Sequence, residues 1–124
     1  MDWLYKQSTG ELFLRGAPVT TPWVVCYSGA GSGKNNPDYQ CVKDIGPIPR
    51  GWYTISSVSQ TPAAYTLVLT PDAGNDMCGR SGFLIHADNI QLPGWASEGC
   101  IVVNDATKRR TIAETGPTRL EVIA

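Results

Sequence analysis

The sequence is poor in the residues that build metal centres and nucleic-acid-binding surfaces. It contains a single histidine, His86, and its four cysteines show no C-x-x-C spacing. Structural zinc sites take their ligands in close pairs, so we expect no metal and no other cofactor. Lysine and arginine total 10 against 11 acidic residues, and the longest basic cluster is residues 108–110. We therefore expect no nucleic-acid partner.

Long hydrophobic runs are also lacking. No apolar run approaches the roughly 18 residues that a membrane helix needs. The first residues, 1–6, do not have the charged-then-apolar layout of a signal peptide. We expect a chain that has no membrane partner and is made in the cytoplasm without a signal peptide.

Turn-forming residues are abundant, with 13 glycines and 9 prolines, which favours short strands over long helices. A length of 124 residues predicts one domain, 1–124, with a hydrophobic core. The only helix that we predict covers residues 106–114, with an N-cap at Asn104–Asp105 and an end at Gly116–Pro117. Short apolar or β-branched segments predict strands over residues 3–7, 11–15, 23–27, 52–55, 65–70, 83–85, 101–103 and 118–123. The expected fold class is mostly β, with one short helix near the C-terminus.

Two reactive side chains lie at the edges of predicted strands. His86 follows the apolar run 83–85, and Cys100 precedes the apolar run 101–103. An imidazole at the end of one strand and a thiol at the start of another suit a pair of cysteine nucleophile and histidine base. A neighbouring imidazolium would lower the thiol pKa from about 8.5 and allow labelling at lower pH. The alternative is an edge histidine and a core cysteine with no joint role.

The residues around this pair predict the rest of an acyl-transfer site. Gly99 would let the backbone approach a substrate, and the N–H groups of Gly99 and Cys100 could face an oxyanion. His86 would then protonate the leaving amine. Because Ala87 offers only backbone, the group that orients the imidazole is a carbonyl or a residue from elsewhere in the chain.

Five further side chains are candidates for substrate binding. Arg80 could bind a carboxylate with two hydrogen bonds, and Trp95 could line a groove or fix its loop to the core. Asp88 and Glu98 could hold the imidazole or an incoming amine. Tyr27, beside the glycine-rich loop at 28–40, could close over a substrate. Solvated surface charge is the alternative for Arg80, Asp88 and Glu98.

The remaining cysteines allow at most one disulfide if Cys100 is a free nucleophile. Cys26 with Cys41 is the expected pair, because that bond would close the glycine-rich loop between them. The alternative is that Cys26, Cys41 and Cys78 are three buried thiols, which is the more common state in a chain with no export signal.

Several motifs together resemble a known family. His86, a loop, and then Ser97-x-Gly99-Cys100 resemble the signature of bacterial L,D-transpeptidases, which are cell-wall enzymes. The chain is more closely similar to the L,D-transpeptidase effectors that type VI secretion delivers. The segments that carry this likeness are residues 5–12, 27–37, 46–55, 79–86 and 97–101.

The resemblance implies a fold, an activity and partners. The fold is an L,D-transpeptidase-like β-sandwich or set of mixed sheets, in which Cys100 is the nucleophile, His86 the base, and Ser97 and Gly99 shape the turn. The substrate is a peptidoglycan tetrapeptide stem, which forms a thioester acyl-enzyme. The implied biology is an antibacterial toxin in the periplasm of a target bacterium, with an immunity protein and a component of the secretion apparatus as partners.

At two points the sequence departs from the family, and these leave open which molecule accepts the acyl group from the thioester. The wider family carries a second histidine where Glu98 stands, and the loop from His86 to Cys100 is shorter than in cross-linking members. Water would make the enzyme an L,D-carboxypeptidase, and an amine would make it a transpeptidase. Two rival functions remain: a non-catalytic β module that binds peptidoglycan or a partner protein, and a different Cys/His amidase or peptidase.

Overall fold

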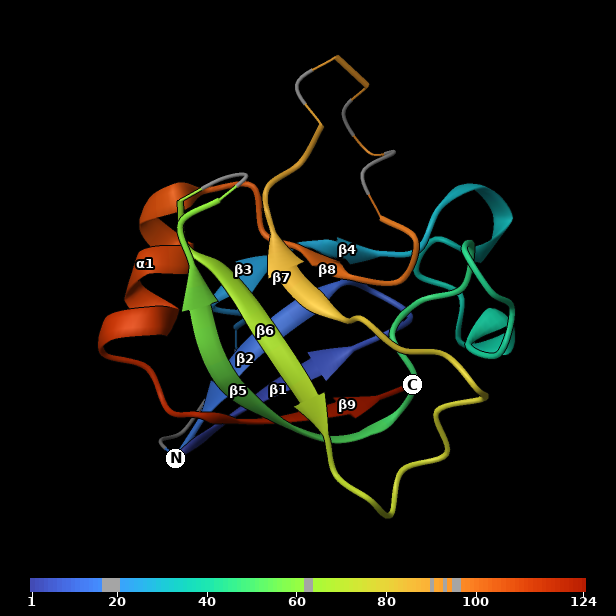
Figure 1. Cartoon of the computed structure of the whole chain (residues 1–124), viewed down its shortest axis with the longest axis horizontal. Coiled ribbons are helices and arrows are strands. Elements are labelled where there is room, and N and C mark those ends of the chain that lie inside the picture. Colours follow the sequence, from blue (N-terminus) through green and yellow to red (C-terminus); the bar gives the residue numbers. More distant parts are fainter. Residues whose placement is uncertain (17–20, 62–63, 90, 93, 95–96) are drawn as a thin grey trace.

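The computed structural model describes residues 1–16, 21–61, 64–89, 91–92, 94 and 97–124. In these ranges the chain forms a 9-stranded mixed sheet with strand order β3-β2-β1-β9-β5-β6-β7-β8-β4 (Figure 1). The strands are β1 (Asp2–Lys6), β2 (Glu11–Arg15), β3 (Val24–Val25), β4 (Tyr27–Ser28), β5 (Gly51–Ser59), β6 (Thr66–Pro71), β7 (Leu84–His86), β8 (Ile101–Val102) and β9 (Arg119–Ile123). The mostly β fold class predicted from the sequence is confirmed.

The sheet is nearly closed on itself. Its two edge strands, β3 and β4, are separated along the chain by Cys26 alone, so the segment predicted as one strand over 23–27 joins the two edges. The Cys26 N–H donates to the Gly10 carbonyl over 2.8 Å. A side chain on Gly10 would collide with the Cys26 carbonyl, and Gly10 has a φ of +74°. This close backbone contact requires the glycine in the turn between β1 and β2.

The core lies inside the curved sheet and follows the alternation of the strands. Trp3 and Tyr5 of β1 and Leu120 and Val122 of β9 point inward from two strands that pair in parallel. The Trp3 indole donates to the Pro117 carbonyl and so ties β1 to the segment that precedes β9. Alternate residues of these two strands therefore face the core, as the two-residue period of a strand requires.

The single α-helix of the described ranges, α1 (Ala106–Glu114), has the predicted bounds. The Asp105 side chain accepts hydrogen bonds from the N–H groups of Thr107 and Lys108, which is the expected N-cap. Buried Arg109 donates to the carbonyls of Val103 and Asn104 and fixes α1 to the segment that follows β8. Two short 3₁₀ turns, η1 (Gly31–Gly33) and η2 (Pro37–Tyr39), interrupt the predicted loop at 28–40.

Both expectations for the cysteines were wrong, because the disulfide joins Cys41 to Cys78, with a sequence separation of 37. Cys26 is buried at the seam of the sheet, where its thiol donates to the Gly10 carbonyl. Cys41 lies on an exposed segment beyond η2. The seam directs Cys26 inward, so it cannot meet Cys41 on the surface.

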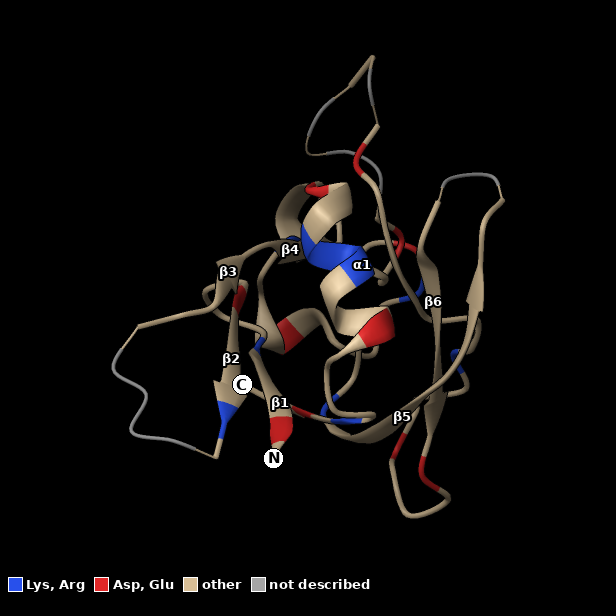
Figure 2. Cartoon of the chain, turned by 90° about the vertical axis from the view of Figure 1, so that its left-hand side faces the viewer, with Lys and Arg blue, Asp and Glu red and all other residues tan. Residues whose placement is uncertain are grey.

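Charged side chains are scattered along the described chain, with basic residues 108–110 gathered on α1 (Figure 2). None of the helices in the described ranges has the length and apolarity that crossing a membrane requires.

Candidate active site

The parallel pairing of β7 with β8 puts Cys100 next to the strand that ends in His86. Ile85 pairs with Ile101 and His86 with Val102, and both isoleucines are buried in the core. Cys100 directly precedes β8, and its Sγ accepts a hydrogen bond of 3.3 Å from the Leu84 N–H at the start of β7. The sulfur therefore lies beside the strand whose last residue is His86. Within the described ranges no hydrogen bond joins the two side chains.

The imidazole of His86 is half-buried and has one partner that fixes its tautomer. Its Nδ1 lies 2.7 Å from the carbonyl oxygen of Ala87. Since a carbonyl can only accept, Nδ1 of the neutral ring carries the hydrogen and Nε2 is left as the basic nitrogen. Of the two orienting groups expected, a carbonyl or a residue from elsewhere in the chain, the carbonyl of the next residue makes this contact.

Cys100 is a free, half-buried thiol. The expectation of a lowered pKa was wrong, because burial raises the pKa of Cys100, and the Glu98 carboxylate raises it further. The Leu84 N–H and the Arg80 guanidinium oppose this rise without cancelling it. The thiol can donate to the Gly82 carbonyl 3.7 Å away, a contact that favours the protonated form. These surroundings favour the thiol form of Cys100 over the thiolate.

The turn that presents Cys100 is held by the buried hydroxyl of Ser97. This oxygen accepts from the N–H of Gly29 at 2.9 Å and of Gly99 at 3.0 Å, and it donates to the Cys100 carbonyl at 2.6 Å. The Gly99 N–H, one of two amides expected to face an oxyanion, is thus engaged inside the turn.

Gly99 itself allows close packing that no other residue would. Its φ is +134°, and a Cβ there would lie 2.5 Å from an Arg80 nitrogen and 2.8 Å from the Phe83 ring. The sequence therefore places a glycine where the backbone passes against the wall of the site.

Ser28 is a second buried serine in this network, and sequence reasoning missed it. Its Oγ donates to the Gly99 carbonyl and accepts from the Ile48 N–H, both over 2.8 Å. Both contacts join residues that are distant in the sequence, so no local pattern distinguishes Ser28 from the loop that follows it. Together, Ser28 and Ser97 fix the backbone immediately before Cys100.

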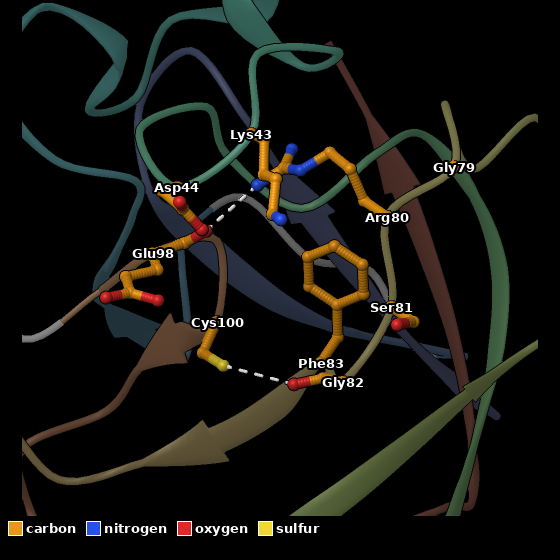
Figure 3. A pocket seen from close by; sticks show the side chains of 9 residues that line it. All are labelled: Lys43, Asp44, Gly79, Arg80, Ser81, Gly82, Phe83, Glu98 and Cys100. Carbon is orange, nitrogen blue, oxygen red and sulfur yellow. Dashed lines mark hydrogen bonds between the residues drawn. The ribbon is translucent and has the colours of Figure 1, made fainter.

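A pocket of about 240 Å³ opens at the sulfur. Figure 3 shows the Cys100 side chain at one end of this pocket, Lys43 and Asp44 toward the other, and Glu98 at the side between them. The remaining lining comes from residues 79–83, in the segment that leads into β7. The thiol is therefore reachable from an open, polar space.

The sequence suggested that Arg80 binds a substrate carboxylate or is a solvated surface charge, but its guanidinium faces backbone carbonyls. Its guanidinium is buried and donates to four backbone carbonyls, and it lies 5.3 Å from the centre of the Phe83 ring. The acceptors are the carbonyls of Gln40, Gly46, Pro47 and Glu98. With these donors engaged by backbone, Arg80 joins the two sides of the pocket, and a substrate carboxylate would have to compete with those carbonyls.

Asp88 and Tyr27 bind each other at the base of the loop that follows β7. The Tyr27 hydroxyl donates to the Asp88 carboxylate over 2.6 Å, and the same carboxylate accepts from the N–H groups of Asn89 and Gly94. Burial alone would raise the pKa of Asp88, but these donors and nearby Lys34 lower it below its ordinary value. The pair thus holds the base of the loop that follows β7. Trp95 lies outside the described residues.

In the part of the chain that the structure describes, no group of three or more His, Cys, Asp or Glu side chains could hold a metal ion.

Comparison with known proteins gives a family and a fold. The family model of the Tlde1 domain matches residues 24–123. The structure of Bdellovibrio bacteriovorus Bd1075 is similar with a TM-score of 0.54 and 22% sequence identity, over 98% of this chain. The chain spans about half of that one, 47%, and the likeness supports the fold alone. No curated protein matches the chain.

The buried contacts of Ser28 predict a loss of stability when its hydroxyl is removed. Ser28→Ala leaves the Ile48 N–H and the Gly99 carbonyl without this partner, which should lower the free energy of unfolding by about 1–3 kcal/mol. Urea unfolding of the variant measures this loss. Ser56→Ala, on the exposed face of β5, is the matched control, and equal stability of the two variants would contradict the structural role of Ser28.

The position of Glu98 predicts a change in the titration of the nucleophile. A carboxylate disfavours a nearby thiolate, so Glu98→Gln should lower the pKa of Cys100 and shift the pH profile of thiol alkylation toward lower pH. The measurement is the alkylation rate of the free enzyme across the alkaline range. Glu11→Gln, on β2, should leave the profile in place, and an unshifted profile in the Glu98 variant would refute the coupling.

Proposed function

Because this chain belongs to the Tlde1 domain family of type VI secretion effectors, we propose that it is a peptidoglycan-modifying cysteine enzyme. It acts on tetrapeptide stems as an L,D-carboxypeptidase or L,D-transpeptidase. The observation that carries the proposal is a free thiol, Cys100, that opens into a polar pocket beside the strand that ends in His86.

The first half of the reaction makes a thioester. The Cys100 sulfur attacks the stem carbonyl at the L-centre of the third residue while Nε2 of His86 takes the thiol proton. The tetrahedral oxyanion collapses, the C–N bond to the terminal D-alanine breaks, and the imidazolium returns the proton to the leaving amine. The Nδ1 contact with Ala87 supports this role, because it leaves Nε2 as the base.

Proton transfer during attack fits the environment of the thiol. Burial raises the pKa of Cys100, so at neutral pH the sulfur starts protonated and needs the base. The Gly99 N–H is engaged by Ser97, which makes the Cys100 N–H the remaining candidate of the two expected oxyanion donors. This arrangement favours general-base activation over a stored thiolate–imidazolium pair.

The second half transfers the acyl group to an acceptor. Water bound near His86 gives a tripeptide and restores the enzyme, whereas an amine gives exchange or cross-linking. In either case His86 removes a proton from the acceptor as its oxygen or nitrogen attacks the thioester carbon. The sulfur leaves and is protonated again.

The biological role follows from the family. We propose an antibacterial toxin that type VI secretion carries into the periplasm of a target cell, where peptidoglycan stems are exposed. Its partners there are the stem peptides, and an immunity protein in the producing strain would block the pocket.

Two observations favour a second function. The raised pKa of Cys100 and the lack of a described hydrogen bond to His86 also suit a module that binds peptidoglycan without cutting it. In that case the pocket would hold a stem peptide, and the thiol would only line it.

The test is turnover of purified disaccharide–tetrapeptide, followed by product mass. The wild-type chain should release D-alanine, Cys100→Ala should lower turnover by more than about 1,000-fold, and His86→Gln should lower it by about 100- to 10,000-fold. Cys26→Ala, which removes the free thiol at the sheet seam, should keep activity. Stem binding with no turnover by the wild type would favour the binding module, and cleavage of another bond would indicate a different acyl-transfer enzyme.

Lys43 is our candidate for the carboxylate contact first assigned to Arg80. It is exposed and lines the pocket, whereas the Arg80 guanidinium is engaged by carbonyls. Lys43→Met should raise KM roughly tenfold, since a hydrogen bond to a charged group contributes about 1.5–3 kcal/mol. Lys6→Met, on β1, is the control variant. For a substrate with its carboxylate converted to an amide, the wild type and the Lys43 variant should have the same KM. An unchanged KM in the Lys43 variant would remove this assignment.

A further inference from the structure

The disulfide between Cys41 and Cys78 joins the two segments that form the pocket walls. We propose that this bond, acting through Arg80, positions the turn that carries Cys100, so that the enzyme is active when oxidised and weakly active when reduced. This inference rests on the proposed function, since it concerns the regulation of the same site.

The location of each cysteine ties the bond to the pocket. Cys41 lies just before Lys43 and Asp44, which line one side, and Cys78 lies just before the lining segment 79–83. The Cα atoms of the two cysteines are 5.2 Å apart. The covalent link therefore sits at the place where the two walls meet.

Arg80 carries the effect of the bond toward the nucleophile. Its guanidinium donates to the carbonyl of Gln40, the neighbour of Cys41, and to those of Gly46 and Pro47 on the same wall. A further bond of 2.9 Å reaches the carbonyl of Glu98, in the turn before Cys100. One side chain thus connects the disulfide-linked wall to the turn of the nucleophile.

The wall segments next to the disulfide, residues 41–44 and 76–82, belong to no strand. The residues that flank them are fixed by other parts of the fold, because the Ala30 N–H donates to the Ile45 carbonyl and the Leu69 N–H donates to the Phe83 carbonyl. Local hydrogen bonds join Val42 to Tyr39, Gly46 to Val42, and the Cys78 N–H to the Asp76 side chain. Segments outside the sheet are the ones that open locally when a restraint is removed. Loss of the disulfide should therefore loosen the pocket while the sheet stays folded.

The bond is accessible to thiol–disulfide exchange. Cys41 is exposed and Cys78 is half-buried, whereas Cys26 is enclosed at the sheet seam. A dithiol reductant converts the bond into two thiols and becomes a disulfide itself. In the reverse step the two thiols lose two protons and two electrons to a disulfide-bearing oxidant, which leaves as a dithiol.

The redox conditions of a bacterial compartment decide whether this disulfide is formed or reduced. The cytoplasm keeps thiols reduced, and the bacterial periplasm oxidises them. A chain that reaches the periplasm in the reduced state would gain its ordered pocket there. In the cytoplasm of the cell that makes it, the same chain would have a loosened pocket and low activity.

The experiment compares the oxidised chain with the same chain reduced by dithiothreitol under anaerobic conditions. Mass analysis after alkylation counts free thiols, and circular dichroism checks that the sheet is kept. Reduction should lower kcat at least tenfold on a disaccharide–tetrapeptide, increase hydrogen exchange in residues 40–47 and 78–82, and reverse on oxidation. The paired variant Cys41→Ser/Cys78→Ser should have the activity of the reduced chain and no response to reductant.

Two controls separate this inference from its premise. Cys26→Ala should respond to reductant as the wild type does, because that thiol takes no part in the bond. Hydrogen exchange and Cys100 alkylation report on the pocket and need no turnover. An inactive wild type would therefore refute the proposed function, while these two measurements would still test whether the disulfide holds the pocket walls. The inference is overturned if reduced protein with two additional thiols keeps its kcat and its exchange pattern. Global unfolding on reduction would overturn it as well.

Discussion

The parallel pairing of β7 with β8 is the constraint on which the site depends. Ile85 and Ile101 are partners in this ladder, and both are buried in the core. A slip of one residue would turn each of them toward the opposite face. Because the core resists that slip, the sulfur of Cys100 is held beside β7, the strand that ends in His86.

The second constraint is a set of hydrogen bonds that side chains make to the backbone of the turn before Cys100. The hydroxyls of Ser97 and Ser28 bind the backbone on both sides of Gly99, and Arg80 binds the carbonyl of Glu98. Each partner comes from a different part of the chain. The sheet thus sets the position of Cys100, and buried polar side chains set the conformation of the turn that carries it.

Those parts of the fold that depend on local signals could be predicted from the sequence. The bounds of α1 follow from the Asp105 cap and the Gly116–Pro117 stop, and the strands follow from short apolar or β-branched segments. Because Ala87 has no polar side chain, a carbonyl was one of the two orienting groups expected for His86. In each case the deciding residues lie within a few positions of each other.

Features that depend on distant contacts could not be predicted. The disulfide partner of Cys41 is set by how two loops meet, and the direction of Cys26 is set by the seam of the sheet. The role of Arg80 depends on carbonyls that are free only because their segments form no strands. The raised pKa of Cys100 likewise comes from burial, which the sequence of the turn does not reveal.

The most direct measurement of the central claim is the intact mass of the protein during a rapid-quench reaction with a tetrapeptide stem. The account predicts a transient adduct equal to the stem without its terminal residue, which fragmentation places on Cys100. It also predicts slower adduct formation when His86 is replaced. Stem turnover that proceeds with no adduct, or with the adduct on another side chain, would contradict the account.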